Sequence, residues 1–152
     1  MQVGCGKMKI KLINAFMKTA KIFAECSTAR RLHVGAIVVK DDRIISIGYN
    51  GMPSGWNNNC EDEIKWPNGE IRFLETKPEV LHAESNAISK LARSSESGEG
   101  ATMFITHSPC LDCAKLIYQS GIKKVFYGEQ YRTTEGINFL EKCNIDIIKL
   151  NV

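Results

Sequence analysis

Residues 101–115 read Ala-Thr-Met-Phe-Ile-Thr-His-Ser-Pro-Cys-Leu-Asp-Cys-Ala-Lys and combine a strand pattern with a helix pattern. Met103–Thr106 is a short apolar run with β-branched residues, which predicts a strand. Residues from about 111 to 120 then predict a helix, so the two cysteines lie at its start, directly after the strand. A strand that runs into a helix in this way indicates an α/β architecture.

The segments that follow repeat this alternation. Lys124–Tyr127 and Ile145–Lys149 predict strands, and a further helix is expected at about 135–143. Each crossover is long enough to return the chain parallel to the preceding strand.

The segments that precede it predict the other half of a sheet. Residues 10–24 and Leu81–Arg93 each carry apolar side chains at helical spacing. Val34–Val39 and Arg43–Gly48 are β-branched runs joined by Lys40-Asp41-Asp42, which predicts a hairpin. We therefore expect a three-layer α/β/α sandwich with a five-stranded mixed sheet.

Asn50–Pro78 separates these strands from the second helix and is rich in glycine, proline, asparagine and charge. It is too long for a tight connection, and long loops often line sites. We expect a functional loop here.

The length of 152 residues is the usual size of one domain, so a single domain is expected over residues 1–152. The composition, with 43% hydrophobic and 24% charged residues, is that of an ordinary soluble protein. No apolar run approaches the ~20 residues of a membrane span, and Met1–Lys7 lacks the apolar core of a secretory signal. A cytoplasmic protein without a membrane partner is expected. In that reducing compartment the six cysteines favour metal binding over disulfides.

The net charge is only +3, but residues 1–33 hold seven Lys or Arg against the single acid Glu25. Aromatic residues are not interleaved with these charges, which favours a solvated helix face over a nucleic-acid patch. We expect no polymeric nucleic acid as partner.

Cys110 and Cys113 are three positions apart, so their sulfurs face the same way on one helical turn. The start of a helix also favours the thiolate form that binds metal. A catalytic zinc keeps three protein ligands and leaves its fourth position to water. With His82 as the third ligand, the sequence predicts one catalytic Zn²⁺ per chain.

Glu84 is the predicted catalytic residue, a carboxylate that moves protons without binding the metal. On a regular helix His82 and Glu84 would point about 200° apart, so they converge only if the helix end itself faces the metal. Alone, Cys-x-x-Cys is more often half of a structural zinc site or a redox pair. Combined, His-x-Glu and Pro-Cys-x-x-Cys are typical of zinc-dependent base deaminases.

The sequence also resembles deoxycytidylate (dCMP) deaminases, including phage-encoded ones, over about residues 30–131. The motifs Gly-Tyr-Asn-Gly-x-Pro and Asn-Cys are the narrow part of the resemblance, and they separate dCMP from tRNA or free bases as substrate. The matching stretches are Val34–Val39, Gly48–Gly55, Asn59-Cys60, His82–Ile88, Ala101–Lys115 and Ser120–Tyr127.

The resemblance implies hydrolysis of dCMP to dUMP and ammonia, which supplies dUMP for thymidylate synthesis, in the host cytoplasm if the chain is phage-encoded. It also implies that Asn50 binds the sugar and that the backbone around Ala83 and Ser108 holds the base. Asn50 could instead cap its loop. The substrate phosphate needs a cation or backbone donors nearby. Arg31 is the candidate, with Tyr131 closing the far side, and Arg30 or lysine residues are the alternatives.

Several relatives bind a second, structural zinc. Here Cys60 is present, but the aligned early cysteine is Ala29, and residues 61–81 contain no His or Cys. Cys26 lies three residues too early. We expect no second zinc, because a tetrahedral site would lack ligands.

The resemblance further implies a homohexamer that dCTP with Mg²⁺ activates and dTTP inhibits. Tyr49, Asn50, Gly51 and Pro53 are the predicted effector contacts, since flexible glycines and exposed backbone donors suit a phosphate. A plain structural turn is the alternative.

Two other functions stay open. One is a deaminase of another substrate, a tRNA adenosine or a free nucleobase, because the metal chemistry would be unchanged. The other is a non-catalytic, zinc-stabilised module that binds nucleic acid, in which Glu84 has no role.

Overall fold

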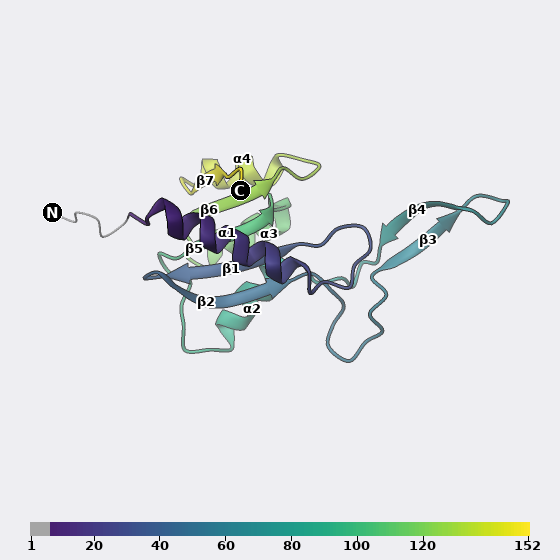
Figure 1. Cartoon of the computed structure of the whole chain (residues 1–152), viewed down its shortest axis with the longest axis horizontal. Coiled ribbons are helices and arrows are strands. Elements are labelled where there is room, and N and C mark those ends of the chain that lie inside the picture. Colours follow the sequence, from purple (N-terminus) through teal and green to yellow (C-terminus); the bar gives the residue numbers. More distant parts are fainter. Residues whose placement is uncertain (1–6) are drawn as a thin grey trace.

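A computed structural model describes residues 7–152, so most of the N-terminal stretch considered for a secretory signal lies outside it (Figure 1). The strands are β1 (Gly35–Lys40), β2 (Arg43–Tyr49), β3 (Glu61–Lys65), β4 (Ile71–Thr76), β5 (Thr102–His107), β6 (Lys124–Glu129) and β7 (Asp146–Lys149). The helices are α1 (Ile10–Ala24), α2 (Ala83–Ala92), α3 (Leu111–Gln119) and α4 (Glu135–Lys142). Within residues 7–152, no helix is both long and apolar enough to cross a bilayer.

Five strands form the main sheet in the order β2-β1-β5-β6-β7. β1 pairs antiparallel with β2 and with β5, while β5, β6 and β7 run parallel because α3 and α4 supply the crossovers. The predicted five-stranded mixed sheet is therefore confirmed.

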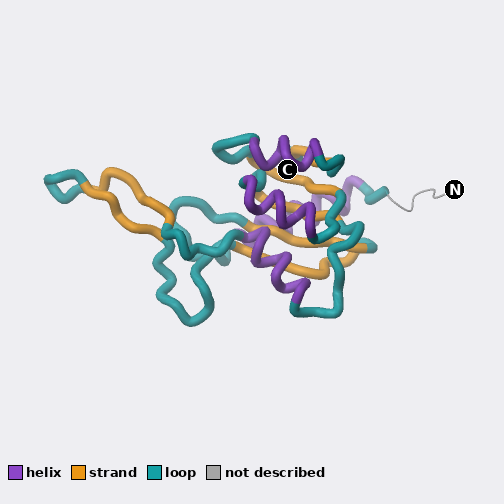
Figure 2. Tube along the Cα trace, turned by 180° about the vertical axis from the view of Figure 1, so that it is seen from behind, coloured by secondary structure: helices purple, strands orange, loops and turns teal. Residues whose placement is uncertain are grey.

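The two faces of the sheet are covered by different helices. Ile37 of β1 packs with Phe16 of α1 on one face, whereas Ala36 packs with Ala87 of α2 and Ile117 of α3 on the other. This alternation follows from the period of two along a strand. α4 lies on the same side as α2 and α3 (Figure 2), which confirms the three-layer arrangement.

One helix boundary differs from the prediction in a way that matters below. The apolar stripe predicted a helix from Leu81, but α2 begins at Ala83. The N–H of Leu81 donates to the carbonyl of Gly51 (2.8 Å), which holds this residue in an isolated β-bridge. His82 is then the N-cap, with an extended ψ of 152°.

The predicted loop at 50–78 is wrong in part, because it contains the β3–β4 hairpin, which projects from the body (Figures 1 and 2). β3 reads Glu-Asp-Glu-Ile-Lys and shows none of the apolar alternation by which strands are recognised. The outer half of the hairpin exposes Trp66, Ile71 and Phe73. The Arg72 guanidinium lies 4.6 Å from the centre of the Trp66 ring. The hairpin is thus stabilised by cross-strand contacts rather than by the core.

Two glycines let backbone segments approach the starts of α2 and α3. Gly48 of β2 lies against the carbonyl oxygen of Ala83, and Gly136 of α4 lies against those of Pro109 and Cys110. A β-carbon at either glycine would overlap these oxygens. Both helix starts are therefore fixed by contacts that only glycine permits.

Candidate active site

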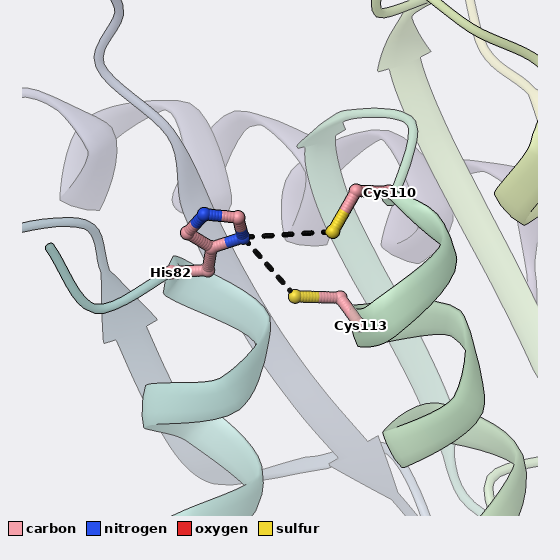
Figure 3. Close-up of side chains that lie close together, drawn as sticks. All are labelled: His82, Cys110 and Cys113. Atoms are coloured by element: carbon pink, nitrogen blue, oxygen red, sulfur yellow. Dashed lines mark hydrogen bonds between the residues drawn. The ribbon is translucent and has the colours of Figure 1, made fainter. Parts of the chain in front are cut away.

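The ends of α2 and α3 bring three potential metal ligands together (Figure 3). His82 is the N-cap of α2, Cys110 is the N-cap of α3, and Cys113 lies in the first turn of α3. The Nδ1 of His82 lies 3.3 Å from the Sγ of Cys113 and 3.7 Å from the Sγ of Cys110. Nitrogen and sulfur ligands of one tetrahedral zinc lie about 3.6 Å apart, so the three residues fit this ion.

The N-cap position of His82 explains how it shares a site with Glu84. His82 is extended and Glu84 is helical, so the 3.6-residue period that would separate their side chains does not apply between them. The helix end faces the metal position, as the sequence required, and both residues line one cavity.

Burial and close contacts shift the proton affinities of these groups. Burial raises the pKa of Glu84 from an ordinary 4.5 to about 7. Hydrogen bonds with Cys113 and then His82 lower the pKa of Cys110 to about 4, while the hydrogen bond with Cys110 and burial raise the pKa of Cys113. The hydrogen bond with Cys110 raises the pKa of His82. A thiolate is thus favoured beside an imidazole, which is the soft donor set that zinc prefers.

A cavity of about 170 Å³ opens beside these residues. It is lined by His82, Glu84 and Cys110, and also by every residue that the sequence assigned to the substrate: Arg31, Asn50, Ala83, Ser108 and Tyr131. The structure therefore brings the predicted substrate residues together with the predicted metal site.

Asn50 is tied to the backbone before β1. Its Oδ1 accepts the N–H of Val34 and its Nδ2 donates to the carbonyl of Leu32, each at 2.9 Å. The capping alternative therefore describes bonds that exist, although Asn50 also lines the cavity. The side-chain amide of Asn50 has two N–H donors. The bond to Leu32 uses one of them, so the other remains for a ligand.

Arg31 and Tyr131 are held at the cavity by hydrogen bonds, and the partner of Arg31 lies outside the predicted set. The Nη1 of Arg31 donates to the Oγ1 of Thr76 (2.7 Å), and the N–H of Tyr131 donates to the Oγ of Ser108 (2.7 Å). Arg31 and Thr76 also line a second, more open cavity of about 690 Å³, which includes Arg132. Sequence reasoning missed Thr76 and Arg132, since neither stands in a motif.

The site lies inside a segment that matches a known family. The family model described as the cytidine and deoxycytidylate deaminase zinc-binding region matches residues 10–129. The chain belongs to this deaminase family. The zinc-binding description agrees with the imidazole and thiolate donors of the site.

Three similar proteins can be compared with the chain. ComE operon protein 2 of Bacillus subtilis is 40% identical over 118 residues, which are 78% of this chain and 59% of that protein. The deoxycytidylate deaminase of Enterobacteria phage T4 is 42% identical over 130 residues, or 64% of this chain and 67% of that protein. The chain spans about three fifths to two thirds of the length of these curated relatives.

The third is a solved structure, the dCMP deaminase from the cyanophage S-TIM5 in complex with dCMP and dUMP. It superposes on this chain with a TM-score of 0.84 and is 46% identical. The match covers 95% of this chain and 100% of that chain. The likeness therefore extends over nearly the whole chain.

The predicted effector segment has fewer free donors than the sequence suggested. The N–H of Asn50 donates to the carbonyl of Val34 (3.2 Å) and that of Gly51 to the carbonyl of Leu81 (3.1 Å). The expectation of exposed backbone donors is therefore wrong at these two residues. Tyr49 belongs to β2 and has a half-exposed ring, with the Nζ of Lys90 6.0 Å from its centre.

Cys60 is not one of the three grouped metal ligands, although it lines the same cavity as His82 and Cys110. It is fully buried, and its Sγ lies 3.6 Å from the Oγ1 of Thr28 and 3.5 Å from the carbonyl of Asn58. Across residues 7–152, His82, Cys110 and Cys113 are the one group of three such side chains whose ligand atoms lie within 4.8 Å of one another.

Proposed function

We propose that this deaminase hydrolyses dCMP to dUMP and ammonia, with one zinc held by His82, Cys110 and Cys113. The observation that carries the proposal is the shared cavity, in which these ligands and buried Glu84 meet the predicted substrate residues. The phage T4 relative, named a deoxycytidylate deaminase, and the cyanophage dCMP deaminase with dCMP and dUMP both support it.

Glu84 is the proton carrier in the proposed reaction. Zinc at this site supplies Lewis-acid activation of water. Glu84 takes a proton from that water and delivers it to the ring nitrogen beside the amino-bearing carbon, while the water oxygen bonds to that carbon. Glu84 then moves the second proton to the amino group, the carbon–nitrogen bond breaks, and ammonia leaves. A pKa raised to about 7 by burial suits a group that accepts and returns protons near neutral pH.

The rest of the cavity is assigned to the nucleotide. The backbone of Ala83 and Ser108 faces the base, Asn50 the sugar, and Arg31 with Tyr131 the 5′-phosphate. Arg31 has no carboxylate partner within 4.0 Å among residues 7–152, and four of its five guanidinium donors remain for a dianion. This cation is what favours a nucleotide over a free nucleobase.

Regulation is the second part of the proposal. We infer a homohexamer in the cytoplasm, of the host if the gene is a phage's, that dCTP with Mg²⁺ activates and dTTP inhibits through the segment Tyr49–Pro53. The support for this regulation is a backbone connection between the two sites. Gly51 pairs with Leu81, the residue before the metal ligand His82, so a ligand that binds at Gly51 can shift the metal site. Rates against dCMP concentration with each triphosphate, beside a light-scattering mass, test it. Unchanged curves from a 17.0 kDa monomer would contradict it.

The activity itself is tested by ammonia release from dCMP, CMP, deoxycytidine, dCTP, guanine and tRNA. We expect dCMP to give the highest kcat/KM, and a Glu84→Gln variant to bind zinc while its turnover falls by about 10²–10⁴. Turnover of tRNA or guanine in place of dCMP would favour the other deaminase function. Zinc binding without any turnover, and with affinity for nucleic acid, would favour the non-catalytic module.

A further inference from the structure

Glu61, the first residue of β3, is a carboxylate buried at the base of the hairpin, with 1% of its surface exposed. Its Oε2 accepts two backbone hydrogen bonds, from the N–H of Arg30 (2.8 Å) and of Arg31 (2.9 Å). Its Oε1 has no hydrogen-bond partner among the described residues. A buried acceptor without a partner is costly, and its presence in a residue that lines a cavity points to a ligand.

Glu61 belongs to the wall of the proposed substrate site. Glu61 lines the same 170 Å³ cavity as Asn50, Arg31 and Glu84. The metal ligands fix the position of the base at one end, and Arg31 offers charge to the phosphate at the other. The sugar must therefore lie between them, in the cavity that Glu61 also lines.

The chemistry of the nucleotide identifies the donor. A carboxylate oxygen accepts hydrogen bonds and donates none. At neutral pH dCMP carries two donor groups, the amino group of the base and the 3′-hydroxyl of the sugar. The amino group is the leaving group and lies at the metal end, so the 3′-hydroxyl remains for Glu61.

The charge of Glu61 is balanced within the protein, so it need not repel the phosphate. The Nε of Arg30 lies 3.7 Å from Oε1, and the two backbone N–H groups hold Oε2. The same guanidinium also pairs with exposed Glu63 through Nη1 (3.0 Å). Arg30 is therefore a counter-ion to Glu61 and leaves Arg31 to the substrate.

We propose that Oε1 of Glu61 accepts a hydrogen bond from the 3′-hydroxyl of the substrate and makes this hydroxyl a requirement for efficient turnover. This proposal rests on the proposed function and adds the residue that reads the sugar. Glu61 also clamps the segment that carries Arg31, so one side chain connects the sugar and phosphate subsites.

Substrate analogues with the unmodified protein test the proposal first. We expect 2′,3′-dideoxycytidine monophosphate and its 3′-fluoro derivative, neither of which has a donor at this position, to lose about 10- to 150-fold in kcat/KM against dCMP. The 3′-amino analogue, which keeps a donor, should lose much less. Equal turnover of dCMP and the dideoxy nucleotide would overturn the proposal while leaving the dCMP deaminase activity intact. No turnover of dCMP would overturn the proposed function, and this inference with it.

A Glu61→Gln variant distinguishes substrate contact from the clamp. We expect the penalty for the dideoxy nucleotide to shrink to about threefold or less, because the charged acceptor is lost. A residue that only clamps Arg30 and Arg31 would lower the rates for dCMP and the dideoxy nucleotide equally, which contradicts the proposal. Glu63→Gln, on the same strand and paired with the same arginine, is the matched control and should keep the full penalty. If Glu61→Gln does not fold, the analogue series decides alone.

Discussion

The Nδ1 of His82 lies 3.3 Å from the Sγ of Cys113, although 31 positions separate the two residues in the chain. They meet because α2 and α3 begin side by side on one face of the sheet, each at a residue that carries a ligand atom (Figure 3). Neither helix start alone supplies enough ligands for zinc. A metal here therefore joins two elements that the chain connects only through β5.

Zinc content is the first prediction. The purified protein should hold about one zinc per chain, and Cys110→Ala should lose it, because two remaining ligands do not hold a tetrahedral site. Elemental analysis measures this directly. Cys26→Ser is the matched control, since Cys26 is exposed and stands apart from the ligand group. A Cys110→Ala protein that keeps stoichiometric zinc would remove this residue from the site.

The buried carboxyl of Glu84 predicts a pH dependence of stability in the zinc-free protein. Burial raises the pKa of Glu84 from 4.5 to about 7. The protonated carboxyl therefore contributes to the free energy of unfolding in full below pH 4.5, and this contribution is lost as the pH rises through 7. Chemical unfolding after chelation, from acid to about pH 8, should show unmodified protein losing about 3 kcal/mol relative to Glu84→Gln. A difference between the two proteins that is flat across this range would mean that the carboxyl ionises normally.

Substitution at Gly48 should damage the metal site from a distance. Gly48→Ala places a β-carbon against the carbonyl oxygen of Ala83, which cannot rotate away, so we expect about 1–3 kcal/mol of destabilisation and weaker zinc binding. Gly51→Ala is the control, because nothing lies within 4 Å of its added β-carbon. Denaturant unfolding and zinc titration measure both effects. Equal behaviour of the two variants would show that the approach of β2 to α2 does not constrain the ligands.

Arg31 should discriminate between nucleotide and nucleoside. A charge-assisted contact is worth about 1.5–3 kcal/mol, so dCMP should exceed deoxycytidine in kcat/KM, and Arg31→Ala should narrow this gap about 10- to 150-fold. Arg72→Ala removes an exposed arginine that stacks on Trp66 and should leave the ratio unchanged. If Arg31→Ala lowered both substrates equally, its bond to Thr76 would be its whole role.

The parts of the fold that pack against a core were predictable from the sequence. The apolar spacing of residues 10–24 predicts α1 with its observed limits, because buried helical faces impose a 3.6-residue period. The hairpin strand Glu61–Lys65 was missed because it packs against no core and so carries no alternation. The turn between β3 and β4 does contain a hairpin signal, Asn68-Gly69, and Gly69 has a φ of +91°.

The site divides in the same way. Metal chemistry restricts residue type and spacing, so the sequence could predict His82, Glu84 and the Cys-x-x-Cys pair. It could not predict Glu61, since an acid in a charged run usually faces solvent. Its burial depends on two backbone N–H groups of Arg30 and Arg31 that only the tertiary fold brings to it.

The segment from the end of β2 to the β3–β4 hairpin also decides what tryptophan fluorescence can report. The chain has two tryptophans, Trp56 and Trp66, which are 55% and 49% exposed and lie between β2 and β4, outside both apolar clusters of the sheet. Indole emission of the native protein should therefore already be that of a largely hydrated ring. Loss of the sheet will change it little, whereas far-ultraviolet circular dichroism will follow that loss. A spectral shift on adding a nucleotide, or on raising the protein concentration, will instead identify an event at the segment between β2 and β4.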